Sequence, residues 1–213
     1  MQQAPARPKL YHITSVVNLP SIVADGLLSD ALVSKRGGPA AAIGMSKLKA
    51  RRLGLPVRCH AGTMVGEFVP FYFCPRSVML YLLHKGNHAE LSYQGGQDPI
   101  VHLEVDMHDV IEWAAAHGVR WAFTPRNAAA TYNMEFFAST DHLHHIDWAA
   151  VAATDWVAVK EAKQAEFLVH GRLPWELVSA IGVRSQVTLD QVTQSIAGAP
   201  HRPPVTIRRG WYY

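Results

Sequence analysis

Cysteine is almost absent from this 213-residue sequence, which contains only Cys59 and Cys74. Two isolated cysteines exclude a disulfide framework and a cysteine-based zinc knuckle. No apolar run approaches the ~18 residues that a membrane-spanning helix needs, and the opening MQQAPARPKL lacks the apolar core of a signal peptide. These absences predict a protein of the reducing cytoplasm with no membrane partner.

Acidic residues are missing from positions 31–66 and from the tail after Asp190. The first of these segments holds seven basic side chains, namely Lys35, Arg36, Lys47, Lys49, Arg51, Arg52 and Arg58. Although the net charge is only +3, blocks of one sign create a surface potential that attracts a polyanion. Charge alone supports a solvated basic face without a partner equally well.

Neither common glycine-rich phosphate loop is present, and no internal repeat is found. Half of the residues are apolar, which predicts a globular chain, and we expect one domain over residues 1–213. Strands are predicted around 10–13, at the start of 67–87, and at 99–106, 120–124, 165–171, 181–185 and 205–209. Helices are predicted at 19–25, 45–54, 77–84, 106–118, 174–180 and 188–198. Without a strict βαβ order, this mixture favours the α+β class.

Polar residues stand at the junction of the first strand and the first helix. Because side chains alternate along a strand, His12 and Thr14 point to one face, which is either a pocket wall or solvent. Asn18 is a candidate cap for the helix, Gly26 can end it, and Ser46 is a candidate cap for the basic helix.

Other polar groups have ordinary structural explanations when taken singly. Glu166 opens an apolar strand in KQAEFLVHG, where a glutamate is usually a solvated edge residue. The cluster DHLHHID, with His142, His144 and His145, lacks the i, i+4 spacing of a helical zinc site, so a solvated loop is favoured and no metal is expected.

Six segments occur in an order that is specific only when they are taken together. They are YHITSVVNLPSIVADGLLS, ARR, VPFYFCPRSVMLY, YQGGQDPIVHL, KQAEFLV followed by PW, and the closing WYY. From about residue 8 onward the chain resembles the DarT family, bacterial toxins that ADP-ribosylate single-stranded DNA. The resemblance implies the ADP-ribosyltransferase fold, in which two small packed β-sheets with flanking helices surround an NAD cleft. NAD is then a co-substrate, and no cofactor is bound permanently.

The resemblance also implies roles for individual residues. The basic segment 35–52 would cover the bound NAD. The implied NAD-binding residues are His12, Thr14, Gly26, Leu27, Arg52, Phe73 and Met79. Glu166 matches the catalytic glutamate and is expected at the edge of the cleft. Arg52 is the second catalytic residue, expected to stabilise the NAD phosphates and to lie where the acceptor's proton departs.

The implied reaction explains these residue types. Breaking the nicotinamide–ribose bond creates an oxocarbenium-like ribose, which a carboxylate stabilises. The acceptor base must leave its stack, so single strands are the expected substrate and thymine the expected base. The irregular segment 125–160 would hold this base, with Lys47, Arg51, Arg76, Arg126, Asn127 and Tyr132 as DNA-binding residues. The resemblance further implies a DarG-like macrodomain antitoxin as partner.

Three alternatives remain at this point. A relative of the same fold could act on RNA or protein, and a DNA-directed relative could modify guanine. A non-catalytic nucleic-acid-binding module would explain the basic segments but neither Glu166 nor the YHIT strand end.

Overall fold

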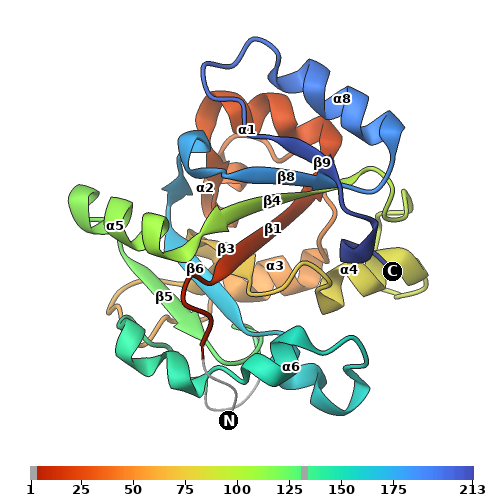
Figure 1. Cartoon of the computed structure of the whole chain (residues 1–213). Coiled ribbons are helices and arrows are strands. Elements are labelled where there is room, and N and C mark those ends of the chain that lie inside the picture. The colour runs from red at the N-terminus through yellow and green to blue at the C-terminus, as the bar shows by residue number, and fades with distance from the viewer. Residues whose placement is uncertain (1–3, 131–133) are drawn as a thin grey trace.

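The computed structural model describes residues 4–130 and 134–213, and most of its strands form one sheet (Figure 1). The strand order is β5-β6-β3-β1-β4-β8-β9. Neighbouring strands are antiparallel except β8 and β9, which are parallel. The bounds are β1 Lys9–Ser15, β3 Phe68–Tyr72, β4 Ile100–Asp106, β5 Trp121–Thr124, β6 Glu166–His170, β8 Ala180–Val183 and β9 Val205–Ile207. A second, two-stranded sheet pairs β2 (Leu27–Leu28) with β7 (Arg172–Leu173).

The α+β class predicted from the sequence is confirmed, with a seven-stranded and a two-stranded sheet. The sheets differ in size because β1 pairs with β3 on one side and β4 on the other. This pairing joins strands from the start, middle and end of the chain into one sheet.

Short helices surround the sheet, and α1 and α8 lie side by side next to β8 and β9 (Figure 1). The α-helices are α1 Leu19–Asp25, α2 Asp30–Lys35, α3 Ser46–Arg52, α4 Val78–Lys85, α5 Met107–His117, α6 Trp148–Ala152, α7 Lys160–Lys163 and α8 Gln186–Ile196. The 3₁₀ turns are η1 Val16–Asn18, η2 Val65–Glu67, η3 Thr140–His145, η4 Val157–Val159, η5 Trp175–Leu177 and η6 Arg209–Trp211. Among the described residues, no helix is both long and apolar enough to cross a membrane.

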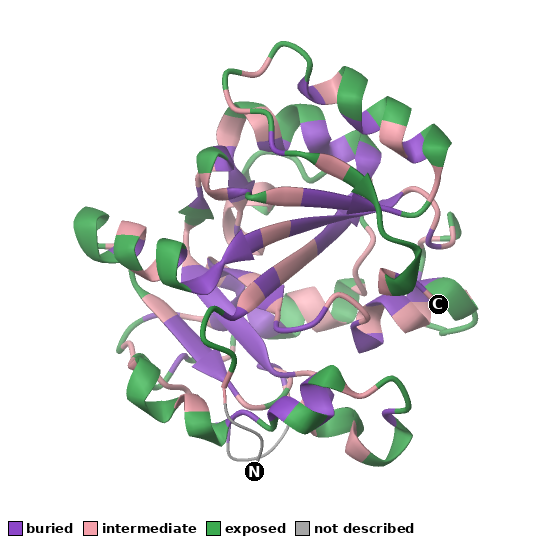
Figure 2. Cartoon of the chain, viewed as in Figure 1, coloured by how far each residue is buried: buried purple, intermediate pink, exposed green. Residues whose placement is uncertain are grey.

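Strand β6 is buried on both faces, as Figure 2 shows by its continuous buried colour. Phe167 and Val169 belong to the main core, whereas Leu168 packs on the opposite face with Phe68 and Ala122. This explains why EFLVH is an almost unbroken apolar run rather than an alternating one. Glu166 shares the parity of Leu168, so its carboxylate projects to that second face.

Several predicted helix ends are confirmed. The Asp106 carboxylate accepts hydrogen bonds from the amides of His108 and Asp109, and Gly118 ends α5 at a φ of +63°. Ser77 caps α4 by accepting from Leu80 N. These side chains satisfy amides that have no partner inside the helix.

Two local predictions, on residues 174–180 and on Ser46, are wrong, and one helix was missed. Residues 174–180 form only the turn η5 instead of a helix, because Ser179 N already bonds to Glu104 O and the chain joins the sheet at Ala180. Helix α2, capped by Ser29, was not predicted. Ser46 does not cap α3 but is its first helical residue.

Candidate active site

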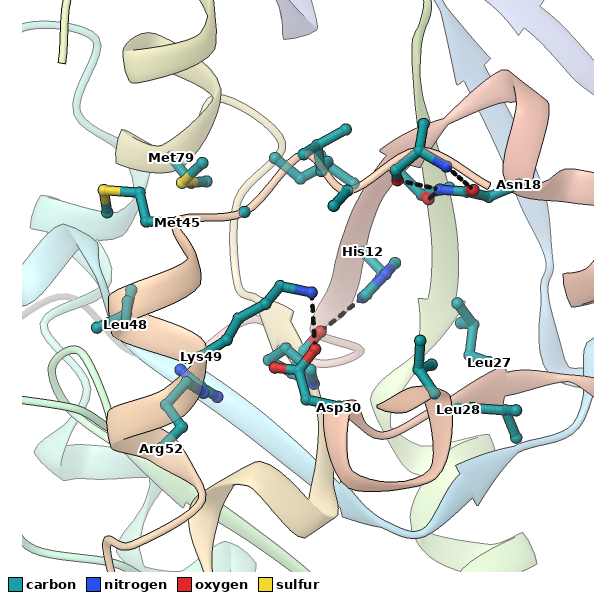
Figure 3. A pocket seen from close by; sticks show the side chains of 18 of the residues that line it. His12, Asn18, Leu27, Leu28, Asp30, Met45, Leu48, Lys49, Arg52 and Met79 are labelled. Carbon is teal, nitrogen blue, oxygen red and sulfur yellow. Dashed lines mark hydrogen bonds and ion pairs between the residues drawn. The ribbon is translucent and has the colours of Figure 1, made fainter. Parts of the chain in front are cut away.

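A pocket opens beside β1, between α1, α2, α3 and the loop of residues 36–45 (Figure 3). Its polar walls come from His12, Thr14, Asn18, Asp30, Lys49, Arg52 and Tyr72. Its apolar walls come from Ile22, Leu27, Leu28, Val33, Ile43, Met45, Leu48, Pro70 and Met79, among others. A few converging polar groups within apolar walls are typical of small-ligand sites.

His12 is held in one tautomer by the neighbouring strand. Its Nδ1 lies 2.9 Å from Pro70 O, and because a carbonyl only accepts, Nδ1 carries the proton. The ring packs edge-on against Phe71. Burial lowers the pKa of His12, so the ring is neutral near pH 7 and its Nε2 can accept a hydrogen bond from a ligand.

Asn18 does not cap α1, contrary to the sequence prediction, because its side chain is used elsewhere. Its Nδ2 donates to Ala41 O at 2.8 Å and to Thr14 Oγ1 at 3.0 Å. Its Oδ1 accepts from Ala41 N at 2.9 Å. The amide therefore ties loop 36–45 to the strand end beside the pocket. Pro20 in the first turn of α1 removes one amide that a cap would have served.

An ion pair links two helices across the pocket. Lys49 Nζ on α3 lies 2.8 Å from Asp30 Oδ1 at the start of α2 (Figure 3). This pair could not be predicted from the sequence, because no spacing or motif connects two positions 19 residues apart.

A buried polar contact joins the end of α3 to the start of β6. Arg52 Nη1 and Nη2 each lie 3.0 Å from Glu166 Oε2, and Ala128 N donates to Oε1 at 3.0 Å. Glu166 is only 1% exposed and Arg52 only 6%. The expectation of an open position for Glu166 at the cleft edge is therefore corrected. Strand register places Tyr72 and Thr124 on either side of Glu166.

Of this ion pair, Arg52 lines the pocket and Glu166 does not. Burial alone would lower the pKa of Arg52, but the Glu166 carboxylate outweighs it and holds the pKa above its ordinary value. Burial, reinforced by Glu166, raises the pKa of Tyr72, so its hydroxyl stays protonated at neutral pH. The pocket wall therefore contains the cationic Arg52 and the protonated Tyr72, with the Glu166 carboxylate bonded to Arg52.

Residues 11–213 match the family described as ssDNA thymidine ADP-ribosyltransferase, DarT. The chain belongs to the DarT family. A DNA ADP-ribosyl transferase of Thermus aquaticus is 39% identical over 211 residues, which is 98% of this chain and 90% of that protein.

Two solved DarT structures show similar architecture. Thermus sp. 2.9 DarT in complex with ADP-ribosylated ssDNA matches with 34% identity and a TM-score of 0.88, over 100% of this chain and 99% of that one. The same protein in complex with NAD+ matches with 33% identity and a TM-score of 0.81, over 99% and 100%.

The structure gathers most NAD-binding residues that the DarT resemblance implied. The pocket lining includes His12, Thr14, Leu27, Arg52 and Met79. The other two, Gly26 and Phe73, lie outside the lining.

Gly26 instead serves backbone packing. At its φ of +79°, an added Cβ would clash with Leu173 O. Phe73 points into the core, where its ring packs edge-on against Trp148 and Phe167, so the prediction that it lines the pocket is corrected. Its neighbour Tyr72 lines the pocket instead, because side chains alternate along the strand.

The residues predicted to bind DNA lie in different parts of the structure. Lys47 and Arg51 are exposed on α3, and Lys47 pairs with Glu90 at 3.1 Å. The Arg76 guanidinium lies 4.4 Å from the centre of the Tyr213 ring.

Beyond β6 lies a second hollow of about 750 Å³. It is lined by Arg58, Pro125, Arg126, Met134, Glu135, His145, Asp147 and Ala162. Asn127 fixes the adjoining loop, since its Nδ2 donates to Gln164 Oε1 and its Oδ1 accepts from Ala129 N. Tyr132 lies outside the described residues.

Proposed function

We propose that this chain transfers ADP-ribose from NAD to a thymine base of single-stranded DNA and releases nicotinamide. The observation that carries the proposal is the Arg52–Glu166 pair. Arg52 lines the pocket, and Glu166 accepts from Ala128 N in the loop before the second hollow. A donor and an acceptor entering from opposite sides would meet at this carboxylate. Membership of the DarT family supports the same reaction.

NAD would occupy the pocket as a substrate, without permanent binding. His12 Nε2 and the Thr14 hydroxyl would bond its ribose or adenine, Leu27 would contact it through the backbone, and Met79 would pack on the nicotinamide. Gly26 would shape this wall indirectly, through its close packing on Leu173.

Entry of NAD requires movement at the pocket mouth. The cavity measures about 190 Å³, which is below the ~300–1,000 Å³ of sites that hold drug-sized ligands. Loop 36–45 borders the pocket and is the segment that would move. The hydrogen bonds between Asn18 and Ala41 would hold it in place again once NAD is bound. After binding, the loop and α3 would cover the dinucleotide.

Glu166 would act on the reacting ribose. As the bond from C1′ to the nicotinamide nitrogen breaks, positive charge develops on the ribose, and a fixed carboxylate stabilises it. The new bond joins C1′ to a thymine ring nitrogen, whose proton is released to water as neutral nicotinamide leaves. Because Glu166 holds Arg52 cationic, we propose that Arg52 stabilises the negative charge left on that nitrogen rather than accepting its proton.

The DNA would lie over the second hollow and the exposed face of α3. The hollow falls within the size range of ligand sites, and Arg58 and Arg126 offer guanidinium groups to DNA there, beside the carboxylates of Glu135 and Asp147. Lys47, Arg51 and Arg76 would contact phosphates, while Asn127 holds the loop in shape. Tyr132 stays a prediction as a base-stacking residue.

The wider setting follows from the family. We propose a toxin that acts in the cytoplasm and is countered by a DarG-like macrodomain antitoxin. We also propose that residues 1–213 form one catalytic domain, because the seven-stranded sheet takes strands from both ends of the chain.

An acceptor panel tests the proposed substrate. Nicotinamide release from NAD is measured with single-stranded DNA, the matching duplex, single-stranded RNA and a protein mixture. Single-stranded DNA with thymine should give the fastest release, and the duplex should be slow because its bases are stacked. Equal release with oligonucleotides that lack thymine but contain guanine would favour the guanine-directed alternative, and fastest release with RNA or protein would overturn the DNA assignment.

A further inference from the structure

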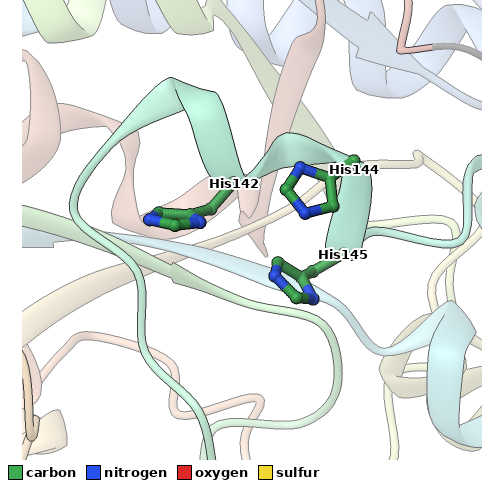
Figure 4. A group of neighbouring side chains, drawn as sticks. All are labelled: His142, His144 and His145. Atoms are coloured by element: carbon green, nitrogen blue, oxygen red, sulfur yellow. The ribbon is translucent and has the colours of Figure 1, made fainter.

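Three histidines gather on the exposed turn η3 (Figure 4). One ligand nitrogen from each of His142, His144 and His145 lies within 4.8 Å of the others. The i, i+4 spacing that these histidines lack is that of an α-helix, whereas η3 is a 3₁₀ turn. In a 3₁₀ turn, residues i and i+3 stand one above the other, so His142 and His145 share a side.

Two of the rings are oriented by their neighbours. His144 Nδ1 lies 2.8 Å from Asp141 O, so Nδ1 donates its proton there and Nε2 keeps a free lone pair. A metal-bound histidine usually makes such a hydrogen bond with its other ring nitrogen. His145 stacks on Phe137 with centroids 4.5 Å apart and planes within 11°.

The support under these rings is tied to the sheet. Phe137 exchanges backbone hydrogen bonds of 2.8 and 2.9 Å with Phe123 of β5, and the His142 ring also packs against Phe137. The histidine side chains themselves are exposed and can rotate. Zinc–nitrogen bonds of about 2.0–2.1 Å place tetrahedral ligands roughly 3.4 Å apart, which small rotations would achieve.

We propose that His142, His144 and His145 bind one divalent transition-metal ion, zinc above all, with water in the remaining position. Imidazole nitrogen suits zinc, copper and nickel, whereas magnesium and calcium prefer oxygen ligands. His145 also lines the second hollow, so the ion would lie at the border of that hollow without touching the Arg52–Glu166 pair.

Calorimetry on untagged, metal-free protein tests the proposal with zinc chloride alone, in the absence of NAD and DNA. One zinc should bind per chain, and magnesium chloride should give no binding. His142→Ala and His144→Ala should each weaken zinc binding at least tenfold. His117→Ala is the matched control and should change nothing, because His117 is equally exposed and also bonds a local backbone carbonyl.

X-ray absorption at the zinc edge supplies the second readout. Three nitrogen ligands and one oxygen ligand are expected, and the triple alanine variant should lose this signature. The three side chains are exposed, so the variants should melt like the parent protein. Absence of zinc binding, a sulfur ligand, or unchanged affinity in the triple variant would overturn the proposal.

Discussion

Arg52 and Glu166 form a two-pronged ion pair in which the two terminal guanidinium nitrogens, Nη1 and Nη2, each lie 3.0 Å from one carboxylate oxygen. The pair is almost fully buried, and Glu166 also accepts from Ala128 N. Removing either partner leaves a buried charge without its counter-charge, which typically costs about 3–5 kcal/mol of folding stability. Loss of activity in a truncated variant would thus mix a chemical defect with a folding defect.

Glu166→Gln reduces the folding defect, because glutamine leaves no cavity. Its one oxygen can still accept from Ala128 N, although its amide NH2 then faces Arg52, which loses its counter-charge, and glutamine cannot stabilise a positive ribose. We expect DNA modification to slow by about a hundredfold or more, as for the loss of one preorganised electrostatic group. The measurements are single-turnover rates and NAD affinity, and NAD affinity should change far less than the rate.

Glu166→Ala serves as the comparison for that variant. It should unfold at a clearly lower temperature than Glu166→Gln, because alanine leaves both Arg52 and Ala128 N without a partner. A Glu166→Ala protein as stable as the parent would show that the ion pair contributes nothing to the fold.

The two adjacent arginines of α3 should differ in importance. Arg52 points inward to Glu166, whereas Arg51 is exposed, since neighbouring helical residues point about 100° apart. Arg52→Lys keeps the charge but loses the planar fork, and losing one charge-assisted hydrogen bond costs about 1.5–3 kcal/mol. We expect at least a roughly tenfold slower reaction for Arg52→Lys, and a weaker, salt-sensitive effect for Arg51→Ala. Equal rate losses would argue against a single inward-facing arginine.

Asn18→Ala should weaken NAD binding. The substitution removes the bonds that tie loop 36–45 to Thr14 and α1, so the loop would spend less time over the dinucleotide. We expect KM for NAD to rise by roughly tenfold with kcat less affected, since each lost hydrogen bond costs about 1 kcal/mol. Ser21→Ala is the control, because Ser21 bonds the carbonyl of Asn18 from an exposed position on α1. A kcat defect with unchanged KM would contradict the proposed role of the loop.

His102 should make the folded state sensitive to acid. It is fully buried, its Nε2 donates to Pro75 O, and burial lowers its pKa to about 4. In the unfolded chain the pKa is about 6.5, so below that pH the unfolded state takes up a proton that the folded state refuses. The stability that the folded protein gains by keeping His102 neutral is complete above about pH 6.5 and is lost as the pH falls towards 4.

Urea unfolding of the parent and of His102→Phe at roughly pH 7 and pH 4.5 measures this effect. Other groups also titrate in this range, so the comparison between the two proteins isolates His102. The parent should lose up to about 3 kcal/mol more stability between the two pH values than the variant does. An identical loss in both proteins would show that His102 carries no such penalty.

Local sequence signals predicted the parts of the fold that depend on near neighbours. Asp106, Ser77 and Gly118 mark helix ends through contacts within a few residues, and these ends are confirmed. The strand beginning at Glu166 was also predicted, because its apolar run is local. The helix expected over 174–180 failed because a distant backbone partner, Glu104 O, draws the chain into the sheet.

The candidate site was predicted only in part, for the same physical reason. Motif order indicated Arg52 and Glu166, but not that these two residues, 114 positions apart, are in contact. Asp30, Lys49 and the tether made by Asn18 depend on how α2, α3 and loop 36–45 pack in space. The 3₁₀ geometry of η3 likewise decides which histidines share a side, and a sequence pattern read at α-helical spacing misses it.

Tandem mass spectrometry of a single-stranded oligonucleotide with one thymine tests the central claim most directly. The parent protein and Glu166→Gln are each incubated with NAD and the oligonucleotide, and the products are weighed and fragmented. The parent should add one ADP-ribose to the thymine, whereas Glu166→Gln should leave the oligonucleotide almost unmodified while still folding and binding NAD. ADP-ribose on another base or on protein alone, or near-normal modification by Glu166→Gln, would contradict the account.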